Sequence, residues 1–308
     1  MATIIPIEVI EHVLDFLHDD TTTLYRCALT HPSWYPHAHS LLYSRVEIRN
    51  RKSYDTIRIR GSREASFRSL FEHTTELVLV NDPESQYTHE TPLTIGGLFP
   101  ALRTITFIHS LRWLTPGWMI VPIVFASVEK LVLRCCDFRT FTDLQHTITA
   151  FPRLRDLRLH FPLCSLRHKE LPNAEQALRR NKLLRLNRLH LVDFTGTRRD
   201  VALLLLLLDW IAYTPCVLEG TITALVIRPA LTWVPDLLGD ERVAKALQTL
   251  LCQLGPSLIE LELPGPRRHD APSTYDFTRI VPASMSYLHM LIASSVLGYS
   301  PDLSIFSS

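Results

Sequence analysis

An apolar triplet at positions p, p+3 and p+5 recurs along this chain, and it constrains the fold more than any other feature. Three copies stand in similar blocks that begin at Phe99, Phe125 and Phe151, so successive blocks are 26 residues apart. Later copies follow at steps of 32, 36 and 36 residues. The triplets are Leu102/Ile105/Phe107, Val128/Leu131/Leu133, Leu154/Leu157/Leu159, Leu186/Leu189/Leu191, Ile222/Leu225/Ile227 and Leu258/Leu261/Leu263, with weaker copies at Val46/Ile48 and Leu77/Leu79.

This spacing is typical of short parallel strands that are joined by helices. A strand points alternate side chains into a core, and parallel strands need a crossover that returns the chain to the same edge. Apolar residues at helical spacing lie between the triplets, at 141–148, 200–212 and 240–254. We therefore expect an α/β fold in which residues 49–264 form an irregular leucine-rich-repeat solenoid. The alternative is an ordinary doubly wound α/β domain, because single triplets arise easily in a chain that is 46% hydrophobic.

A run of six leucines within 201–208 resembles part of a membrane span. The apolar run ends at Asp209, and Pro215 follows soon after. It is much shorter than the roughly 20 residues that a spanning helix needs. We expect a helix that is buried on most of its sides, and no membrane partner.

The last segment, 265–308, departs from the repeat pattern. It opens with a turn-like run rich in proline and arginine, and no clear triplet follows. Solenoids need a polar capping end. The segment is interpreted either as a divergent cap or as a mispredicted gene end.

Residues 1–48 form a separate amphipathic segment. Pro6 suits the first turn of a helix because its φ is fixed and it lacks an N–H. A polar break at 18–21 separates that helix from a second apolar run at 23–29. A unit this small closes too little surface to bury its apolar faces alone, so we expect a partner. The apolar residues at helical spacing in the first helix are Val9, Ile10, Val13, Leu14 and Leu17.

The order of these residues resembles an F-box, most closely those of proteins abundant in mushroom-forming (basidiomycete) fungi. The resemblance rests on Ile5-Pro6, Asp15-Phe16-Leu17, Leu24-Tyr25-Arg26-Cys27-Ala28-Leu29 and Ser33-Trp34. It implies that residues 1–48 bind the Skp-type adaptor of a Skp–cullin–F-box ubiquitin ligase, and through it a cullin. The adaptor-facing residues carried over are Ile5, Pro6, Ile10, Leu14, Leu24 and Trp34. Which of them belong instead to the module's own core stays open, and a plain helical cap is the alternative interpretation.

The resemblance implies a non-catalytic subunit whose repeats recruit a protein substrate. The alternative is a repeat scaffold that acts outside any ubiquitin ligase. An enzyme is not expected, because the sequence has no Gly-x-Ser-x-Gly elbow, phosphate loop or His-Glu-x-x-His motif. Neither a metal nor another cofactor is expected, because Cys135 and Cys136 are adjacent and no Cys-x-x-Cys exists.

Charge and cysteine usage favour a cytoplasmic or nuclear protein. With 32 basic and 31 acidic residues the net charge is +1, so no global field attracts nucleic acid or anionic membranes. The six cysteines lack a disulfide-framework spacing. Acidic residues interrupt the N-terminal apolar run, so we expect no secretory signal.

One basic cluster, within 167–188, is a candidate surface for an acidic substrate segment. A solvated helix face is the alternative, and the absence of aromatic residues there makes RNA a poor fit. The candidate residues are Arg167, Lys169, Arg179, Arg180, Lys182 and Arg185.

Overall fold

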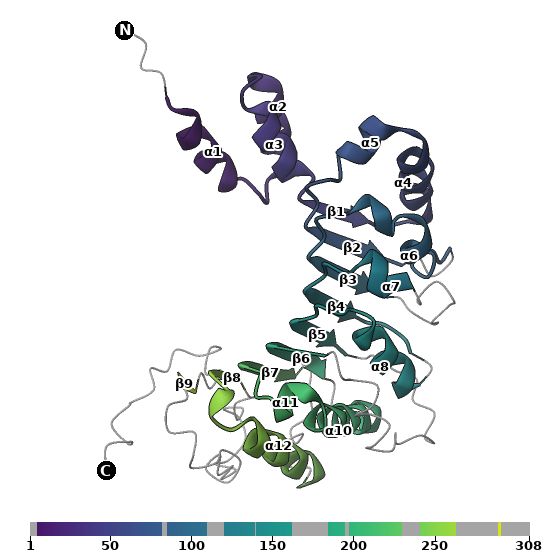
Figure 1. The fold of residues 1–308 in the computed structure, drawn as a ribbon, viewed down its shortest axis with the longest axis vertical. Coiled ribbons are helices and arrows are strands. Elements are labelled where there is room, and N and C mark those ends of the chain that lie inside the picture. Colours follow the sequence, from purple (N-terminus) through teal and green to yellow (C-terminus); the bar gives the residue numbers. More distant parts are fainter. Residues whose placement is uncertain are drawn as a thin grey trace. The chain divides into compact units, whose positions relative to one another are not determined.

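The structure is a computed structural model of an α/β protein with parallel strands and helices (Figure 1). It describes residues 5–81, 85–109, 120–138, 140–161, 184–194, 197–229, 241–262 and 289–290. Contacts within the chain define two compact units. The first comprises Met1–Asp137 and Ala150–Arg153, and the second comprises Phe138–Thr149 and Leu154–Ser308.

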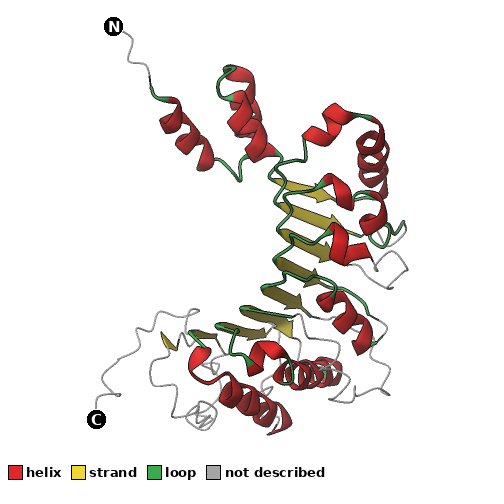
Figure 2. Ribbon diagram, in the orientation of Figure 1, coloured by secondary structure: helices red, strands yellow, loops and turns green. Residues whose placement is uncertain are grey.

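The first unit begins with three helices and continues as alternating strands and helices. Its helices are α1 (Ile7–Asp15), α2 (Thr21–Thr30), α3 (Tyr35–Leu42), α4 (Arg51–Arg63), α5 (Ala65–Ser69), α6 (Thr91–Thr94), the 3-10 helix η1 (Gly96–Leu98) and α7 (Val121–Val124). Its strands are β1 (Arg45–Ile48), β2 (Glu76–Val80), β3 (Thr104–Ile108) and β4 (Lys130–Arg134). Within this unit α4, α6 and α7 lie on one side of the strands (Figure 2).

The second unit repeats this alternation. Its helices are α8 (Phe141–Thr149), α10 (Arg198–Ala212), α11 (Pro215–Leu218), α12 (Glu241–Leu254) and the 3-10 helix η3 (Gly255–Ser257). Its strands are β5 (Asp156–His160), β6 (Arg188–Phe194), β7 (Ala224–Pro229), β8 (Glu260–Glu262) and β9 (His289–Met290).

In each unit, strands that are consecutive in the sequence pair in parallel. In the first unit Leu77 aligns with Ile105, which aligns with Leu131. The last two residues of each triplet are therefore stacked on the core side of the strands. In β2, β3 and β4 these six side chains are all 0% exposed. The expectation of parallel strands with helical returns is confirmed. This sequential order is consistent with a solenoid, whereas a doubly wound sheet reverses its order at a switch point.

A row of hydroxyl groups adds a regular contact that the triplet pattern did not predict. The residue before the first triplet position donates a hydrogen bond to a carbonyl of the preceding repeat. Ser127 Oγ donates to the Leu102 carbonyl at 2.7 Å, and Thr221 Oγ donates to the Leu186 carbonyl at 2.8 Å. Ser257 repeats the contact with the Ile222 carbonyl at 3.3 Å. These bonds satisfy carbonyls at the strand entrances, where the chain changes direction.

The leucine run forms α10, as expected for a buried helix. Its N-cap is Thr197, whose hydroxyl accepts a hydrogen bond from the Asp200 N–H at 3.2 Å. Trp210 meets Phe141 of α8 edge-to-face, with ring centroids 5.9 Å apart. The fully buried apolar residues lie on one face, about half of the circumference: Leu203, Leu204, Leu207, Leu208, Trp210 and Ile211. Val201, Ala202, Leu205 and Leu206 on the remaining surface are half-buried.

The segment 265–308 contributes one described strand. In β9, His289 aligns with Glu260 and Met290 aligns with Leu261, both in parallel register. The parallel ladder therefore extends beyond the last triplet. The remaining residues of this segment lie outside the described part of the chain.

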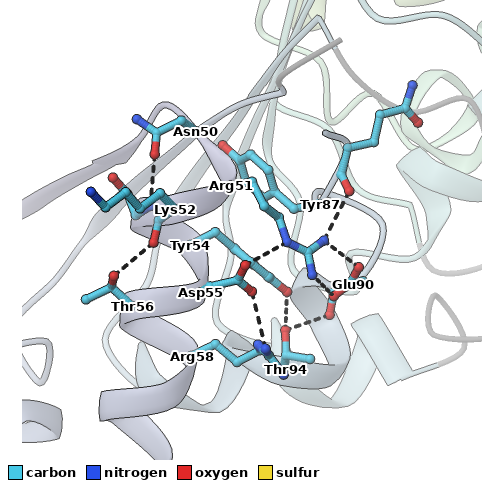
Figure 3. Close-up of polar contacts among 12 residues, drawn as sticks. Asn50, Arg51, Lys52, Tyr54, Asp55, Thr56, Arg58, Tyr87, Glu90 and Thr94 are labelled. Atoms are coloured by element: carbon cyan, nitrogen blue, oxygen red, sulfur yellow. Dashed lines mark hydrogen bonds and ion pairs between the residues drawn. The ribbon is translucent and has the colours of Figure 1, made fainter. Parts of the chain in front are cut away.

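A polar cluster ties α4 to the segment before α6 (Figure 3). Arg51 Nη1 donates to Glu90 at 2.7 Å and to the Gln86 carbonyl at 3.2 Å, while its Nε donates to Asp55 at 3.0 Å. These contacts, chiefly the hydrogen bond to Glu90, raise the pKa of Arg51 above its usual value. The side chains of Arg51 and Glu90 are about one-third exposed, so the cluster joins two elements at the surface.

Beside this cluster, the buried Tyr87 hydroxyl lies within hydrogen-bond distance of two strand-end carbonyls, Ile48 at 2.7 Å and Val80 at 2.5 Å. We expect Tyr87→Phe to lower the free energy of unfolding by about 1–2 kcal/mol, because the two carbonyls lose the one proton that they share away from water. Urea denaturation of the full chain measures this. Tyr213→Phe is the matched control, since Tyr213 is 42% exposed. Equal stability of the two variants would contradict the assignment.

Candidate interaction surface on the N-terminal helices

The first helix begins directly after Pro6, which is its N-cap residue. Pro6 has the extended backbone expected before a helix, and Glu8 lies in the first turn, where a carboxylate complements the helix dipole. Leu14 is the buried residue of this helix. The predicted helix is thus present, and it starts at Ile7, one residue after the proline.

The three N-terminal helices share a small core. Leu14, Leu24, Ala28 and Ala38 are buried together, one or two from each helix. The side chains packed around them are half-buried: Ile10, Leu17, Cys27, Trp34, Leu41 and Leu42. Four small or medium-sized buried residues make a core of limited size.

A second apolar strip runs along α1 and is not covered. Val9, Val13 and Phe16 are 51%, 55% and 73% exposed. Val9 and Val13 lie one turn apart in α1, and Phe16, its C-cap residue, continues the same row. This row lies next to the one that carries Ile10, Leu14 and Leu17. The helix is therefore apolar over about half of its circumference, and its own module buries only part of that arc.

The second helix adds two more exposed apolar side chains, Tyr25 and Leu29. They are 59% and 68% exposed and lie one turn apart. Asp20 caps this helix: its carboxylate accepts hydrogen bonds from the Thr23 hydroxyl at 2.6 Å and the Thr23 N–H at 3.0 Å. The hydroxyl bond is the main cause of a lowered pKa at Asp20.

One polar contact joins the first and third helices across the module. His37 Nε2 lies 2.8 Å from Asp15 Oδ1. The side chain of His37 is 26% exposed and that of Asp15 is 53% exposed. Together with the small core, this contact fixes α1 against α3 while the apolar strip on α1 faces outward.

The predicted adaptor residues fall into three groups. Ile5, at 59%, and Pro6 are exposed. Ile10 and Trp34 are half-buried against the module core. Leu14 and Leu24 are 2% and 0% exposed, so they have almost no surface to offer and can only shape the module from within. The assignment of these residues to an adaptor stays a prediction.

Sequence reasoning did not single out the exposed strip. The available signal was the width of the apolar arc on the first helix, because one buried face needs only one row of apolar residues. This helix has two such rows: Val9, Val13 and Phe16, and Ile10, Leu14 and Leu17. Periodicity alone could not show which of the two rows would be covered.

Most of the predicted basic cluster lies outside the described residues: Arg167, Lys169, Arg179, Arg180 and Lys182. Arg185 is described, and its side chain is 73% exposed. Its Nε lies 3.9 Å from Glu219 Oε2, which is a weak surface pair. The structure thus gives one member of the proposed acidic-substrate surface.

No group of three or more His, Cys, Asp and Glu side chains is arranged to hold a metal ion within the described residues. Cys136 lies in the core with its Sγ 3.5 Å from the Phe107 carbonyl. Cys216 is also buried, and its Sγ accepts from the Leu186 N–H at 3.2 Å and donates to the Leu184 carbonyl at 3.0 Å. These two thiols act as packing and hydrogen-bonding groups.

We expect thiol reagents to modify the native chain at Cys135 and Cys252 before Cys216. The first two are exposed, whereas burial raises the pKa of the Cys216 thiol and keeps it protonated. Timed labelling with N-ethylmaleimide followed by peptide mass spectrometry measures the order. In urea all three should react at similar rates. Early labelling of Cys216 in the native chain would show that α11 opens readily.

Among the described helices, none is both long and apolar enough to cross a bilayer. No protein-family model matches the chain. A search of curated proteins also finds no match.

Proposed function

We propose that this protein is a non-catalytic, substrate-recruiting subunit of a Skp–cullin–F-box ubiquitin ligase. Residues 1–48 are assigned as the F-box and residues 49–264 as an irregular leucine-rich-repeat domain. The observation that supports this most is the uncovered apolar strip on a small, capped three-helix module. Together with the F-box-like order of residues, it argues that α1 docks on another protein.

The exposed side chains are numerous enough to support such a contact. Fully burying one large aliphatic or aromatic side chain contributes about 1.5–3 kcal/mol. Association itself costs an estimated 4–15 kcal/mol, so three or more buried side chains are needed before binding becomes stable. Val9, Val13 and Phe16 are only partly exposed, so each contributes part of that amount. The requirement is met when the flanking Ile5 and the α2 pair Tyr25 and Leu29 contribute as well.

The repeats are assigned the role of holding a protein substrate. Among the described residues of the first unit, no helix lies on the strand face opposite α4, α6 and α7 (Figure 2). Surfaces of this kind bind proteins in solenoids, and function resides in their side chains rather than in the fold. The ligase would act by proximity, since a substrate held near the ubiquitin-charged enzyme has a high effective concentration.

The test is co-expression of the full chain with a Skp-type adaptor from a basidiomycete fungus, followed by gel filtration. A stable equimolar complex that also retains a cullin supports the ligase subunit. A complex that excludes the cullin would favour the alternative of a scaffold outside any ligase. Separate elution of two folded proteins would overturn the proposal.

A further inference from the structure

The outward face of α4 is exposed, whereas its inner side is buried against its own unit. The inner side of this helix carries Tyr54, which is 0% exposed, and Gly61. A Cβ at Gly61 would lie 2.6 Å from a methyl carbon of Leu98, so the helix packs closely on η1 through that side. Lys52, Ile59 and Arg63 lie seven and four residues apart on the opposite face.

Most cations on the flanks of α4 are neutralised within the chain. Arg51 pairs with Asp55 and Glu90, as described above, and Arg58 Nη2 lies 3.3 Å from Asp55 Oδ1. Arg60 makes a two-pronged contact with the Glu64 carboxylate, the closest approach being 2.8 Å. These pairs leave little net charge on the sides of the helix.

The outward row differs from the flanks. Lys52 and Arg63 are exposed, and neither has an ion pair among the residues that the structure describes. Ile59 lies between them and is 42% exposed. The Thr56 hydroxyl in the same row donates to the Lys52 carbonyl at 2.9 Å, so it is already satisfied. The row therefore presents two free cations about 16 Å apart, with an apolar side chain between them.

We propose that the outward face of α4, through Lys52, Ile59 and Arg63, binds an acidic amphipathic helical segment of another protein. Charge complementarity selects the acidic segment, and Ile59 selects an apolar residue between the carboxylates. A helix has the same rise per residue as α4, so carboxylates about three turns apart match Lys52 and Arg63. This surface is separate from the apolar strip on α1, and the proposal does not depend on adaptor binding.

A nucleic acid fits this face less well. A duplex carries about one charge per 1.7 Å of its axis, and binding proteins commonly neutralise several phosphates at once. Two free cations separated by an apolar side chain neutralise few phosphates, and burying Ile59 against a phosphate backbone contributes little.

The test uses fluorescence anisotropy of the full chain with a labelled Glu/Leu peptide of about four helical turns. The comparison ligands are a scrambled peptide of the same composition and a duplex RNA of about 16 base pairs. Lys52→Glu with Arg63→Glu should weaken peptide binding at least about tenfold at about 0.1 M salt, and less at about 1 M, where screening is strong. Ile59→Ser should weaken it about threefold or more at both salt concentrations.

The matched control is Arg134→Glu with Arg153→Glu, which changes the net charge equally at two exposed positions of the same unit. This control should bind the peptide within about twofold of the native chain, because a distant charge is screened. Equal weakening by both double variants would overturn the site. The site would also be overturned if the peptide showed no saturable binding up to about millimolar protein, or if the scrambled peptide bound equally well. Tighter binding of the RNA, abolished by Lys52→Glu with Arg63→Glu, would overturn the choice of a peptide ligand.

Discussion

Under the proposed function, a chain with Val9→Glu and Val13→Glu is expected to bind the Skp-type adaptor at least about 100-fold more weakly than the native chain. Each valine would bury its exposed half in the complex, and a glutamate there would take a charge out of water without a partner. A loss of about 1.4 kcal/mol at each position is enough for this factor. Isothermal titration of the purified chain against the adaptor measures it.

Folding should be preserved in this variant. Both positions are already about half exposed, and glutamate is a good helix former. Circular dichroism and the urea midpoint should therefore match those of the native chain. The variant differs in this respect from Ile10→Asp, which would place a charge against the module's own core and confound binding with unfolding.

The matched control places the same change on the return helices of the first unit. Leu93 and Ile123 are 61% and 78% exposed on α6 and α7. Leu93→Glu with Ile123→Glu removes as much exposed apolar surface and adds the same charge. It should leave adaptor affinity within about twofold, because neither side chain belongs to the α1 strip that is proposed to be buried by the adaptor. Equal losses in both double variants would exclude α1 as the docking helix.

Gly96→Ala is expected to lower the free energy of unfolding by about 2–3 kcal/mol. A Cβ at Gly96 would lie 2.1 Å from Val124 Cγ1 and 3.2 Å from a ring carbon of Phe125. Valine has few rotamers to escape into, and Phe125 is 1% exposed, so the repeat behind η1 must shift. Urea denaturation followed by tryptophan fluorescence and circular dichroism measures the change.

Gly97→Ala is the matched control in the same short helix. A Cβ at Gly97 would meet no atom within 4 Å. The substitution should be neutral or stabilise the chain by up to about 1 kcal/mol, because alanine reduces the entropy of the unfolded chain. Opposite signs at neighbouring glycines would show that packing between repeats, rather than helix propensity, makes Gly96 necessary. Destabilisation of both by the same amount would contradict this.

The strands were predictable because their signal is local and repeated. Within each triplet, the spacing of the apolar residues shows the alternation of a strand. The intervals between equivalent residues such as Leu77, Ile105 and Leu131 show that the chain returns to the same edge. The long helices α10 and α12 were predictable for the same reason, since their apolar faces recur with a helical period. The hydroxyl contacts of Ser127, Thr221 and Ser257 were not, because a donor shows no partner until the repeats are stacked.

The candidate site divides in the same way. The sequence alone determined that residues 1–48 contain amphipathic helices and that parallel strands follow, because apolar periodicity specifies local structure. Only the tertiary structure decided that Leu14 and Leu24 lie inside while Val9, Val13 and Phe16 lie outside. On α4 it likewise decided which cations are neutralised and which are free. Burial and pairing depend on which face meets a neighbouring element, and that contact joins residues far apart in the chain.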